Sequence, residues 1–207
     1  MGKKLLFVAA MFWGVVPLNA QNLPKNSVDL VLGFTTSVCS EKYDNAIVGF
    51  TLGLDIRHTL AVLKNEKTSV YVLTGMHYVR KGGKTTTDIS KWLDNDVNLI
   101  CNQIQIPLHG GLNFKFNKCS LYLDVGPYLG ATVSEDTDND KNAKIETSEF
   151  GYGVNLGIRF KHFGIGFGSE QGLTNFGKYS NNKGTLKSNE TLNFTNTIGH
   201  IDLRWTF

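Results

Sequence analysis

A histidine, an aspartate and an arginine alternate near the C terminus, at His200, Asp202 and Arg204. A histidine beside a carboxylate is a pairing that enzymes use for general-base catalysis. Alternate residues of a β-strand share one face, so the three side chains are expected to lie together. No serine or cysteine stands beside them where it could act as a nucleophile. We therefore interpret the trio as part of a buried ion network, and we expect no catalytic residues.

A second candidate is the acidic stretch that contains Asp136, Asp138 and Asp140. This D-x-D-x-D spacing could offer carboxylate oxygens to calcium. A calcium loop of the EF-hand type would need glycine where Lys141 stands and glutamate where Thr147 stands. We interpret the stretch as a solvated loop.

The other histidines and the glycine-rich stretches give no further site. The histidines are scattered along the chain without the spacing of metal ligands. The stretches GYGVNLG and GIGFG lack the following helix that a phosphate-binding loop requires. We expect no metal and no cofactor. The scattered histidines are His58, His77, His109 and His162.

The stretch from Glu149 to Glu170 indicates which kind of element positions these side chains. In EFGYGVNLGIRF, apolar residues occupy every even position, while glycine, amide or charge occupies every odd one. A period of two is typical of a β-strand with one apolar and one polar face. Similar segments recur along the chain, although residues 68–80 are apolar on both faces and their facing stays open. The eight expected strands are residues 28–35, 46–57, 68–80, 100–109, 121–133, 149–160, 163–170 and 200–207.

The connections between the expected strands alternate in length. Those after the second, fourth and sixth strands are brief, namely KNEK, FNK and KH, whereas those after the third, fifth and seventh are long and polar. Outer-membrane barrels have short periplasmic turns and longer extracellular loops. The pattern therefore predicts an all-β fold, an eight-stranded antiparallel up-and-down transmembrane β-barrel.

The size of such a barrel decides which face looks inward. The interior of an eight-stranded barrel is just wide enough for side chains to fill it. Aromatic residues such as Phe150, Tyr152 and Trp205 would overfill it, whereas glycines interleaved with charged residues suit a narrow polar lumen. The apolar face is therefore expected to contact lipid.

The charged residues of the glycine-rich faces are then expected to compensate one another inside the barrel, because a buried charge without a partner is costly. Strand order suggests Asp124 with Arg159 and Asp29 with Arg204 as neighbouring pairs. The expected lumenal network comprises Asp29, Asp55, Arg57, Asp124, Glu149, Arg159, Glu170, His200, Asp202 and Arg204.

Residues 1–20 have the features of a cleaved secretory signal. Lys3 and Lys4 precede the apolar run LLFVAAMFWGVV, and PLNA ends at Ala20. Cleavage would leave residues 21–207 as one outer-membrane β-barrel domain. Loss of the two lysines lowers the formal charge from +3 to +1. Nucleic-acid binding then has no electrostatic motive.

No later segment reaches the ~20 apolar residues of a membrane-spanning helix. The three cysteines are Cys39, Cys101 and Cys119, and they cannot all pair with one another. A bridge between Cys39 and Cys101 stays open at this point.

Four short segments, HYVRKGGK, NQIQIPLHGGL, YLDVGPYLG and GLTNF, resemble the PorT-like outer-membrane β-barrel family. That family is known from bacteria that glide or carry a type IX secretion system. The resemblance extends from about Val28 to Phe207 and implies a barrel in the outer membrane of a Gram-negative bacterium. The C-terminal IDLRWTF, ending in Phe207, also resembles the signal read by the barrel-insertion machinery.

The expected function is that of a closed barrel acting through its extracellular loops, as a scaffold, an adhesin or a secretion-system accessory. The expected partners are outer-membrane lipid, the insertion machinery and cell-surface or secretion-system proteins, with no nucleic acid. One alternative is a lipid-modifying barrel enzyme, which needs a His–acid or Ser–His pair on the lipid-facing rim. Another is a soluble periplasmic ligand-binding barrel, which needs an apolar lumen.

Overall fold

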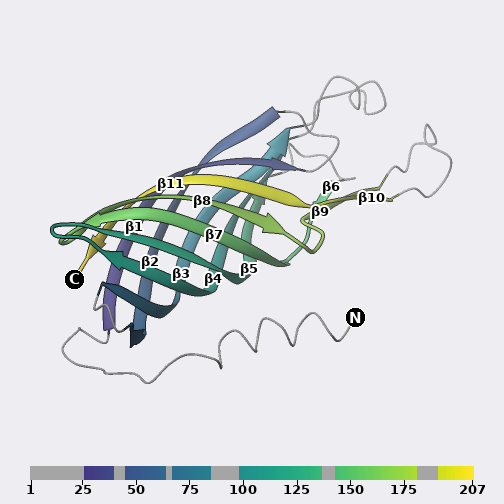
Figure 1. The fold of residues 1–207 in the computed structure, drawn as a ribbon. Helices are drawn as coiled ribbons and strands as arrows, with labels where there is room; N and C mark the ends of the chain where they lie inside the picture. Colours follow the sequence, from purple (N-terminus) through teal and green to yellow (C-terminus); the bar gives the residue numbers. More distant parts are fainter. Residues whose placement is uncertain (1–25, 40–44, 64–66, 85–97, 137–142, 181–190) are drawn as a thin grey trace, which may run out of the picture.

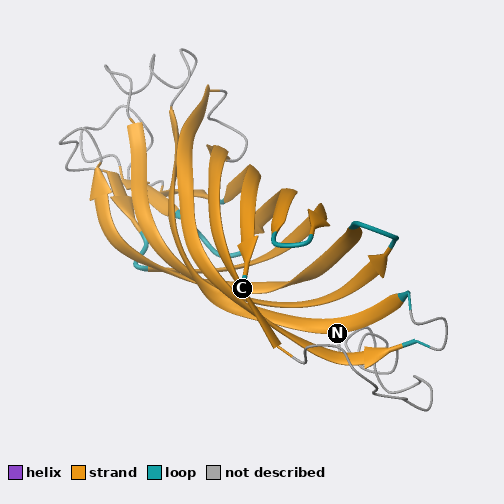
Figure 2. Cartoon of the chain, turned by 90° about the vertical axis from the view of Figure 1, so that its left-hand side faces the viewer, coloured by secondary structure: helices purple, strands orange, loops and turns teal. Residues whose placement is uncertain are grey.

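The computed structural model describes residues 26–39, 45–63, 67–84, 98–136, 143–180 and 191–207, which form eleven strands. Eight of these strands close into one barrel (Figures 1 and 2). Within the described residues, no helix is long and apolar enough to cross a membrane. The barrel strands are β1 (Asn26–Cys39), β2 (Asn45–Val62), β3 (Thr68–Lys84), β4 (Asn98–Lys115), β5 (Ser120–Asp136), β7 (Ser148–Phe160), β8 (Phe163–Gly172) and β11 (Asn196–Thr206).

Each barrel strand pairs antiparallel with the next one along the chain, and β11 pairs with β1 to close the barrel. The closing seam runs from Asp29 opposite Thr206 to Cys39 opposite Asn196. The predicted eight-stranded antiparallel barrel is confirmed. The brief connections lie at the end where β11 finishes, and the shortest contains only Lys161 and His162 (Figure 1).

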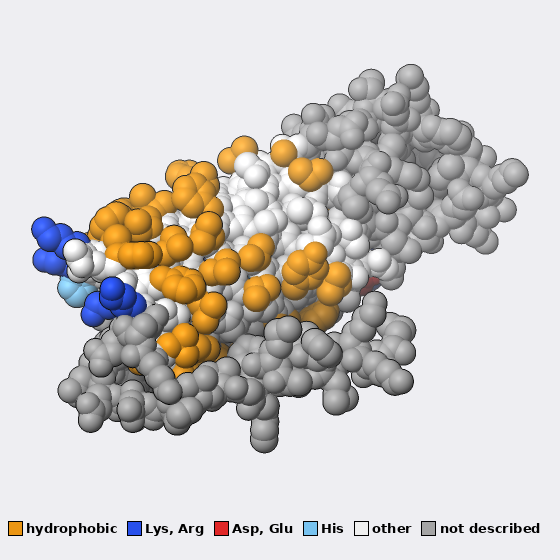
Figure 3. Space-filling model, in the orientation of Figure 1, with side chains coloured by type: hydrophobic (Ala, Val, Ile, Leu, Met, Phe, Trp, Pro, Cys, Tyr) orange, Lys and Arg blue, Asp and Glu red, His pale blue; other side chains and the backbone are white. Residues whose placement is uncertain are grey.

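The alternation seen in the sequence sets the two faces of the barrel wall. On β7, Val154 is 41% exposed on the outside, whereas its neighbour Asn155 is 8% exposed and points inward. The same division holds on the neighbouring strands, so apolar side chains cover the outside of the barrel (Figure 3). An apolar exterior is what a bilayer requires, because lipid cannot satisfy polar groups.

Outward aromatic side chains gather toward both ends of this apolar band. Phe160, Phe163 and Trp205 follow one another across neighbouring strands at the short-turn end. Toward the long-loop end, the rings of Phe50 and Tyr78 lie 5.8 Å apart. Paired aromatic girdles of this kind mark the two interfaces of a membrane barrel.

The facing of β3, which the sequence left open, is set by the structure. Tyr71, Leu73, Val79 and Lys81 are buried inside the barrel, while Met76 is exposed on the outside. The inward side chains near the short-turn end of β3 are thus apolar or aromatic, and the inward row ends with Lys81 near the long-loop end. This mixture is why hydrophobicity alone did not distinguish the two faces.

A second, smaller sheet lies at the long-loop end and has no counterpart in the sequence prediction. Its order is β10 (Thr191–Phe194), β9 (Gly177–Ser180) and β6 (Ala143–Ile145). β6 belongs to the connection between β5 and β7, and the other two belong to the connection between β8 and β11 (Figure 1). We call these three strands the loop-end sheet. It joins two long connections into one unit.

Candidate functional site

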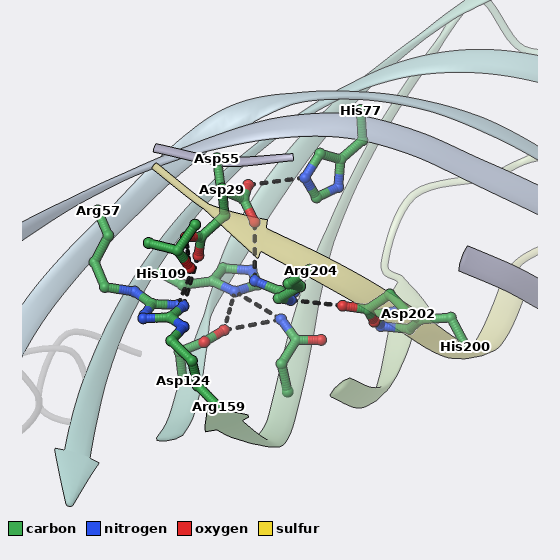
Figure 4. A network of polar contacts seen from close by, with 12 residues as sticks. Asp29, Asp55, Arg57, His77, His109, Asp124, Arg159, His200, Asp202 and Arg204 are labelled. Atoms are coloured by element: carbon green, nitrogen blue, oxygen red, sulfur yellow. Dashed lines mark hydrogen bonds and ion pairs between the residues drawn. The ribbon is translucent and has the colours of Figure 1, made fainter. Parts of the chain in front are cut away.

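All ten residues expected in the lumenal network lie on inward faces of the barrel wall. Seven are buried, while Arg159, Glu170 and His200 are half-buried. Figure 4 shows most of them converging on the barrel interior from strands on opposite sides. The network therefore extends across the barrel interior and connects strands on opposite sides of the wall. The seven buried residues are Asp29, Asp55, Arg57, Asp124, Glu149, Asp202 and Arg204.

The carboxylate of Asp29 lies near the short-turn end and binds two arginines. Its Oδ2 is 2.7 Å from Nη2 of Arg159 and 3.2 Å from Nη2 of Arg57. The Thr206 hydroxyl donates a hydrogen bond of 2.7 Å to its other oxygen. Because β7 is three strands away from β1 around the wall, Arg159 reaches Asp29 across the lumen.

Arg204 links two further carboxylates at the centre of the network. Its Nη1 lies 3.0 Å from Asp55 and its Nε 2.6 Å from Asp202. A histidine approaches each of these acids as well, because His77 Nε2 is 2.8 Å from Asp55 and His200 Nδ1 is 3.0 Å from Asp202 (Figure 4). Each carboxylate is thus shared between a guanidinium and an imidazole, and this satisfies buried charge.

The two ion pairs named from strand order are wrong. Within the described residues, Asp124 binds no arginine, and Asp29 pairs with Arg159 and Arg57 in place of Arg204. The reason is strand register, because Arg159 lies opposite Ser120, while Asp124 lies opposite Asn155 four residues further along β5. Strands that are neighbours in order can therefore carry charges too far apart to touch.

Asp124 is instead held by three donors that lie outside the predicted network. The Tyr71 hydroxyl, Nδ2 of Asn155 and Nδ1 of His109 each lie 2.8 Å from one of its oxygens. Asn155 was expected to face the lumen, whereas His109 was treated as one of several scattered histidines. The signal available in the sequence was that His109 lies on the polar face of its strand, opposite the apolar face.

Tyr122 lies at the centre of the arginine cluster. The guanidinium carbons of Arg57, Arg159 and Arg204 lie 5.3 to 5.6 Å from its ring centroid. Arg57 also stacks on the ring of Tyr71 at 4.5 Å. Such cation–π contacts stabilise positive charge where water is excluded. The two tyrosines thus serve as additional partners for the arginines.

Two inward glycines provide the space for these tyrosine rings. A β-carbon on Gly157 would lie 2.3 Å from the Tyr122 ring, and one on Gly111 would lie 2.4 Å from the Tyr71 ring. Any larger residue would push the rings out of the arginine cluster. The glycine-rich faces are therefore matched to large inward side chains on neighbouring strands.

A separate cluster closes the long-loop end of the lumen. Lys81 is completely buried, and its Nζ lies 2.7 Å from Glu149 Oε2. The Tyr128 hydroxyl donates to the other oxygen of Glu149. The ammonium lies 5.7 Å from the Tyr128 ring and 5.6 Å from the ring of Phe176, which belongs to the loop between β8 and β9.

Phe176 ties the loop-end sheet to this cluster. It is 1% exposed, and its carbonyl accepts a hydrogen bond of 2.9 Å from the backbone of Glu146. Nearby, β1 also contacts β3, the second strand from it around the wall, where the Ser37 hydroxyl bonds to the backbone of Gly82 at 2.7 and 2.8 Å. The long-loop mouth is therefore filled by side chains and narrowed by the strands themselves.

Between the two clusters lies a cavity of about 20 Å³, lined by residues that include His77, His109, Asn155, Glu170 and His200. This volume suits one or two water molecules. The interior is polar and largely occupied by side chains, as expected for a barrel of eight strands. These residues do not form the apolar lumen that a soluble barrel would need to bind a hydrophobic ligand.

The structure describes all three cysteines but only part of the acidic stretch. All three cysteines are free thiols, so the bridge left open between Cys39 and Cys101 is not formed. Within the described part of the chain, no three metal-ligating side chains cluster. Asp138 and Asp140 of the acidic stretch, like the expected signal at residues 1–20, lie outside the described residues.

The sequence of residues 19–177 matches the family model described as outer membrane protein beta-barrel domain. The match covers well over half of the 207 residues. The chain belongs to this outer-membrane β-barrel family. This membership accounts for the apolar exterior, the aromatic girdles and the polar lumen, and it assigns the barrel to the outer membrane. No curated protein matches the chain in sequence.

Several solved barrels have a similar course of the chain. Ail, the attachment invasion locus protein of Yersinia pestis, solved with the heparin analogue sucrose octasulfate, is 15% identical with a TM-score of 0.41, covering 89% of this chain and all of its own. Neisserial surface protein A is 11% identical with a TM-score of 0.47, covering 90% and 100%. The outer-membrane enzyme PagL is 11% identical with a TM-score of 0.40, covering 83% and 97%. Such low similarity carries no information on function.

Proposed function

We propose that this outer-membrane barrel is closed and acts through its long-loop end, as a scaffold or adhesin or as an accessory of a secretion system. The observation that carries the proposal is the loop-end sheet, in which two separate long connections pair strand to strand. Phe176 anchors this sheet in the mouth of the lumen. A sheet held in place in this way offers a preformed surface to a partner.

Resemblance to the PorT-like family supports the secretion-system variant of this proposal. We further propose that the chain is not an enzyme. Support comes from the placement of His200, Asp202 and Arg204, because Asp202 is shared between the other two and all three face the lumen, away from lipid. Incubation of the refolded protein with outer-membrane lipids should leave them intact by mass spectrometry, and release of fatty acid would contradict this part of the proposal.

Site-specific crosslinking tests the partner surface. A photoreactive amino acid replaces Lys178 on β9 or Thr191 on β10, and the matched control replaces Lys118 in the short turn between β4 and β5. We expect one crosslinked outer-membrane or cell-surface protein from the two loop-end positions and none of that mass from Lys118. Identical products from both ends, or no product from the loop end, would contradict the proposal.

A further inference from the structure

A groove lies on the outer wall of the barrel, at the long-loop end, where β5 and β7 meet the loop that leaves β8. Its volume is about 530 Å³, within the range of small-molecule sites. Its floor is the cross-strand pair Leu129 and Phe150, whose side chains are 61% and 41% exposed. These side chains point away from the lumen, so the groove opens toward the membrane side of the wall.

The walls of this rim groove are fixed by backbone hydrogen bonds. On one side, the Phe150 carbonyl accepts bonds of 2.8 and 3.2 Å from the amides of Leu173 and Thr174, and the Phe150 amide donates to the Thr174 hydroxyl at 2.9 Å. On the other side, Thr132 bonds through its hydroxyl to the Glu146 carbonyl, also at 2.9 Å. The groove is therefore a preformed shape held by both connections.

The chemistry of the lining changes along the groove. Leu129 and Phe150 continue the apolar rows of β5 and β7, such as Val125 and Val154, that contact the acyl region of the membrane. Above them the lining is polar, with Ser148, Thr174, Asn175 and two carboxylates, Glu146 and Glu149, of which Glu149 is paired with Lys81. The occupant must therefore be amphipathic, with its polar part at the level of the headgroups.

The polar lining also selects the kind of headgroup. Hydroxyl and amide side chains donate and accept hydrogen bonds, and a carboxylate only accepts them. Among the described residues, neither lysine nor arginine lines the groove. A phosphate group would find none of the cationic partners that it prefers, whereas the many hydroxyls of a sugar match this lining.

We propose that the rim groove binds an uncharged glycolipid of the outer leaflet, with its sugar against Ser148, Thr174 and Asn175 and an acyl chain along Leu129 and Phe150. The continuity of the groove with the lipid-facing surface identifies a membrane lipid as the occupant. This inference does not depend on a partner at the loop-end sheet, because the groove lies on the barrel wall below it.

Native mass spectrometry of the full-length refolded protein tests this inference. The protein is released from micelles containing equal amounts of monoglucosyl diacylglycerol and phosphatidylglycerol with the same acyl chains. We expect the glycolipid to be retained over the phospholipid by about tenfold, which corresponds to ~1.4 kcal/mol. Equal retention of the two lipids, or preference for phosphatidylglycerol, would overturn the proposal.

Matched variants locate the site. The double variant Phe150→Ala/Asn175→Ala removes one apolar and one polar contact from exposed side chains and keeps every backbone bond of the groove wall. It is expected to lose the tenfold preference. The control Phe167→Ala removes an outward ring of β8 that is not part of the groove and should keep the preference. Circular dichroism and heat-dependent gel mobility verify that both variants fold. Unchanged preference in the folded double variant would place the lipid elsewhere.

Discussion

Asp124 accepts hydrogen bonds from Tyr71, His109 and Asn155 inside the barrel. Asp124→Ala would leave these buried donors without their acceptor, and we expect the free energy of unfolding to fall by about 2–5 kcal/mol. Urea titrations of the protein folded in phosphatidylcholine vesicles measure this loss. The adjacent outward residue Val125 provides the control, because Val125→Ala alters only a contact with lipid and should have a much smaller effect. Similar losses for both variants would show that the hydrogen bonds of Asp124 do not stabilise the barrel.

Val154 and Asn155 are consecutive residues with opposite surroundings. We expect Asn155→Leu to lower the free energy of unfolding by about 1–3 kcal/mol, because it removes the 2.8 Å bond to Asp124 and places an apolar group among polar ones. Val154→Leu should be nearly neutral in lipid, whereas Val154→Arg should lower it by roughly 2–4 kcal/mol near the bilayer midplane. The same vesicle titrations measure all three. A silent Asn155→Leu together with a damaging Val154→Leu would mean that the two faces are reversed.

At the scale of the elements, the hairpin of β7 and β8 contains a strained residue. Lys161 has a φ of 50° in the two-residue turn, a left-handed conformation that is unfavourable for residues with a β-carbon. Lys161→Gly removes that carbon, and we expect a gain in the free energy of unfolding of about 0.5–1 kcal/mol. Lys161→Ala is the control for loss of the charged side chain and should give no gain. Equal stabilisation by both substitutions would attribute the effect to the side chain and not to the backbone.

The elements also show what could be predicted from sequence and what could not. The alternation on β7 gave both the strand and its facing, because one row is wholly apolar and the other is glycine, amide and charge. On β3 the buried Leu73 and Val79 made both rows look alike. The sequence placed the charged residues on the inward faces. It did not show which of them pair with each other, because sequence order does not reveal the register that sets Arg159 opposite Ser120. The strands of the loop-end sheet have three or four residues each, too few to show a period.

At the scale of the whole molecule, the filled lumen makes a prediction about transport. The arginine cluster, the Lys81–Glu149 pair and Phe176 occupy the interior and leave a cavity of only about 20 Å³ near its middle. We expect planar-bilayer recordings of purified refolded protein to show no sustained large conductance, in contrast to a sixteen-stranded porin, which has an aqueous channel. Long-lived openings that are absent from mock-refolded samples would contradict a closed barrel.

Asp29 and Asp55 stand directly opposite each other on β1 and β2, and both are completely buried. Among the described residues of the first hairpin, Arg57 is the one cation that pairs with either aspartate, and it binds Asp29. Asp55 obtains its guanidinium from Arg204 on β11, which is the last of the eight barrel strands along the chain. His77 on β3 supplies an imidazole to Asp55, but the guanidinium that this carboxylate shares arrives only when β11 closes the seam. Partly assembled barrels that lack β11 should be unstable in lipid, so that the charges of the lumen favour only the barrel that has closed between β1 and β11.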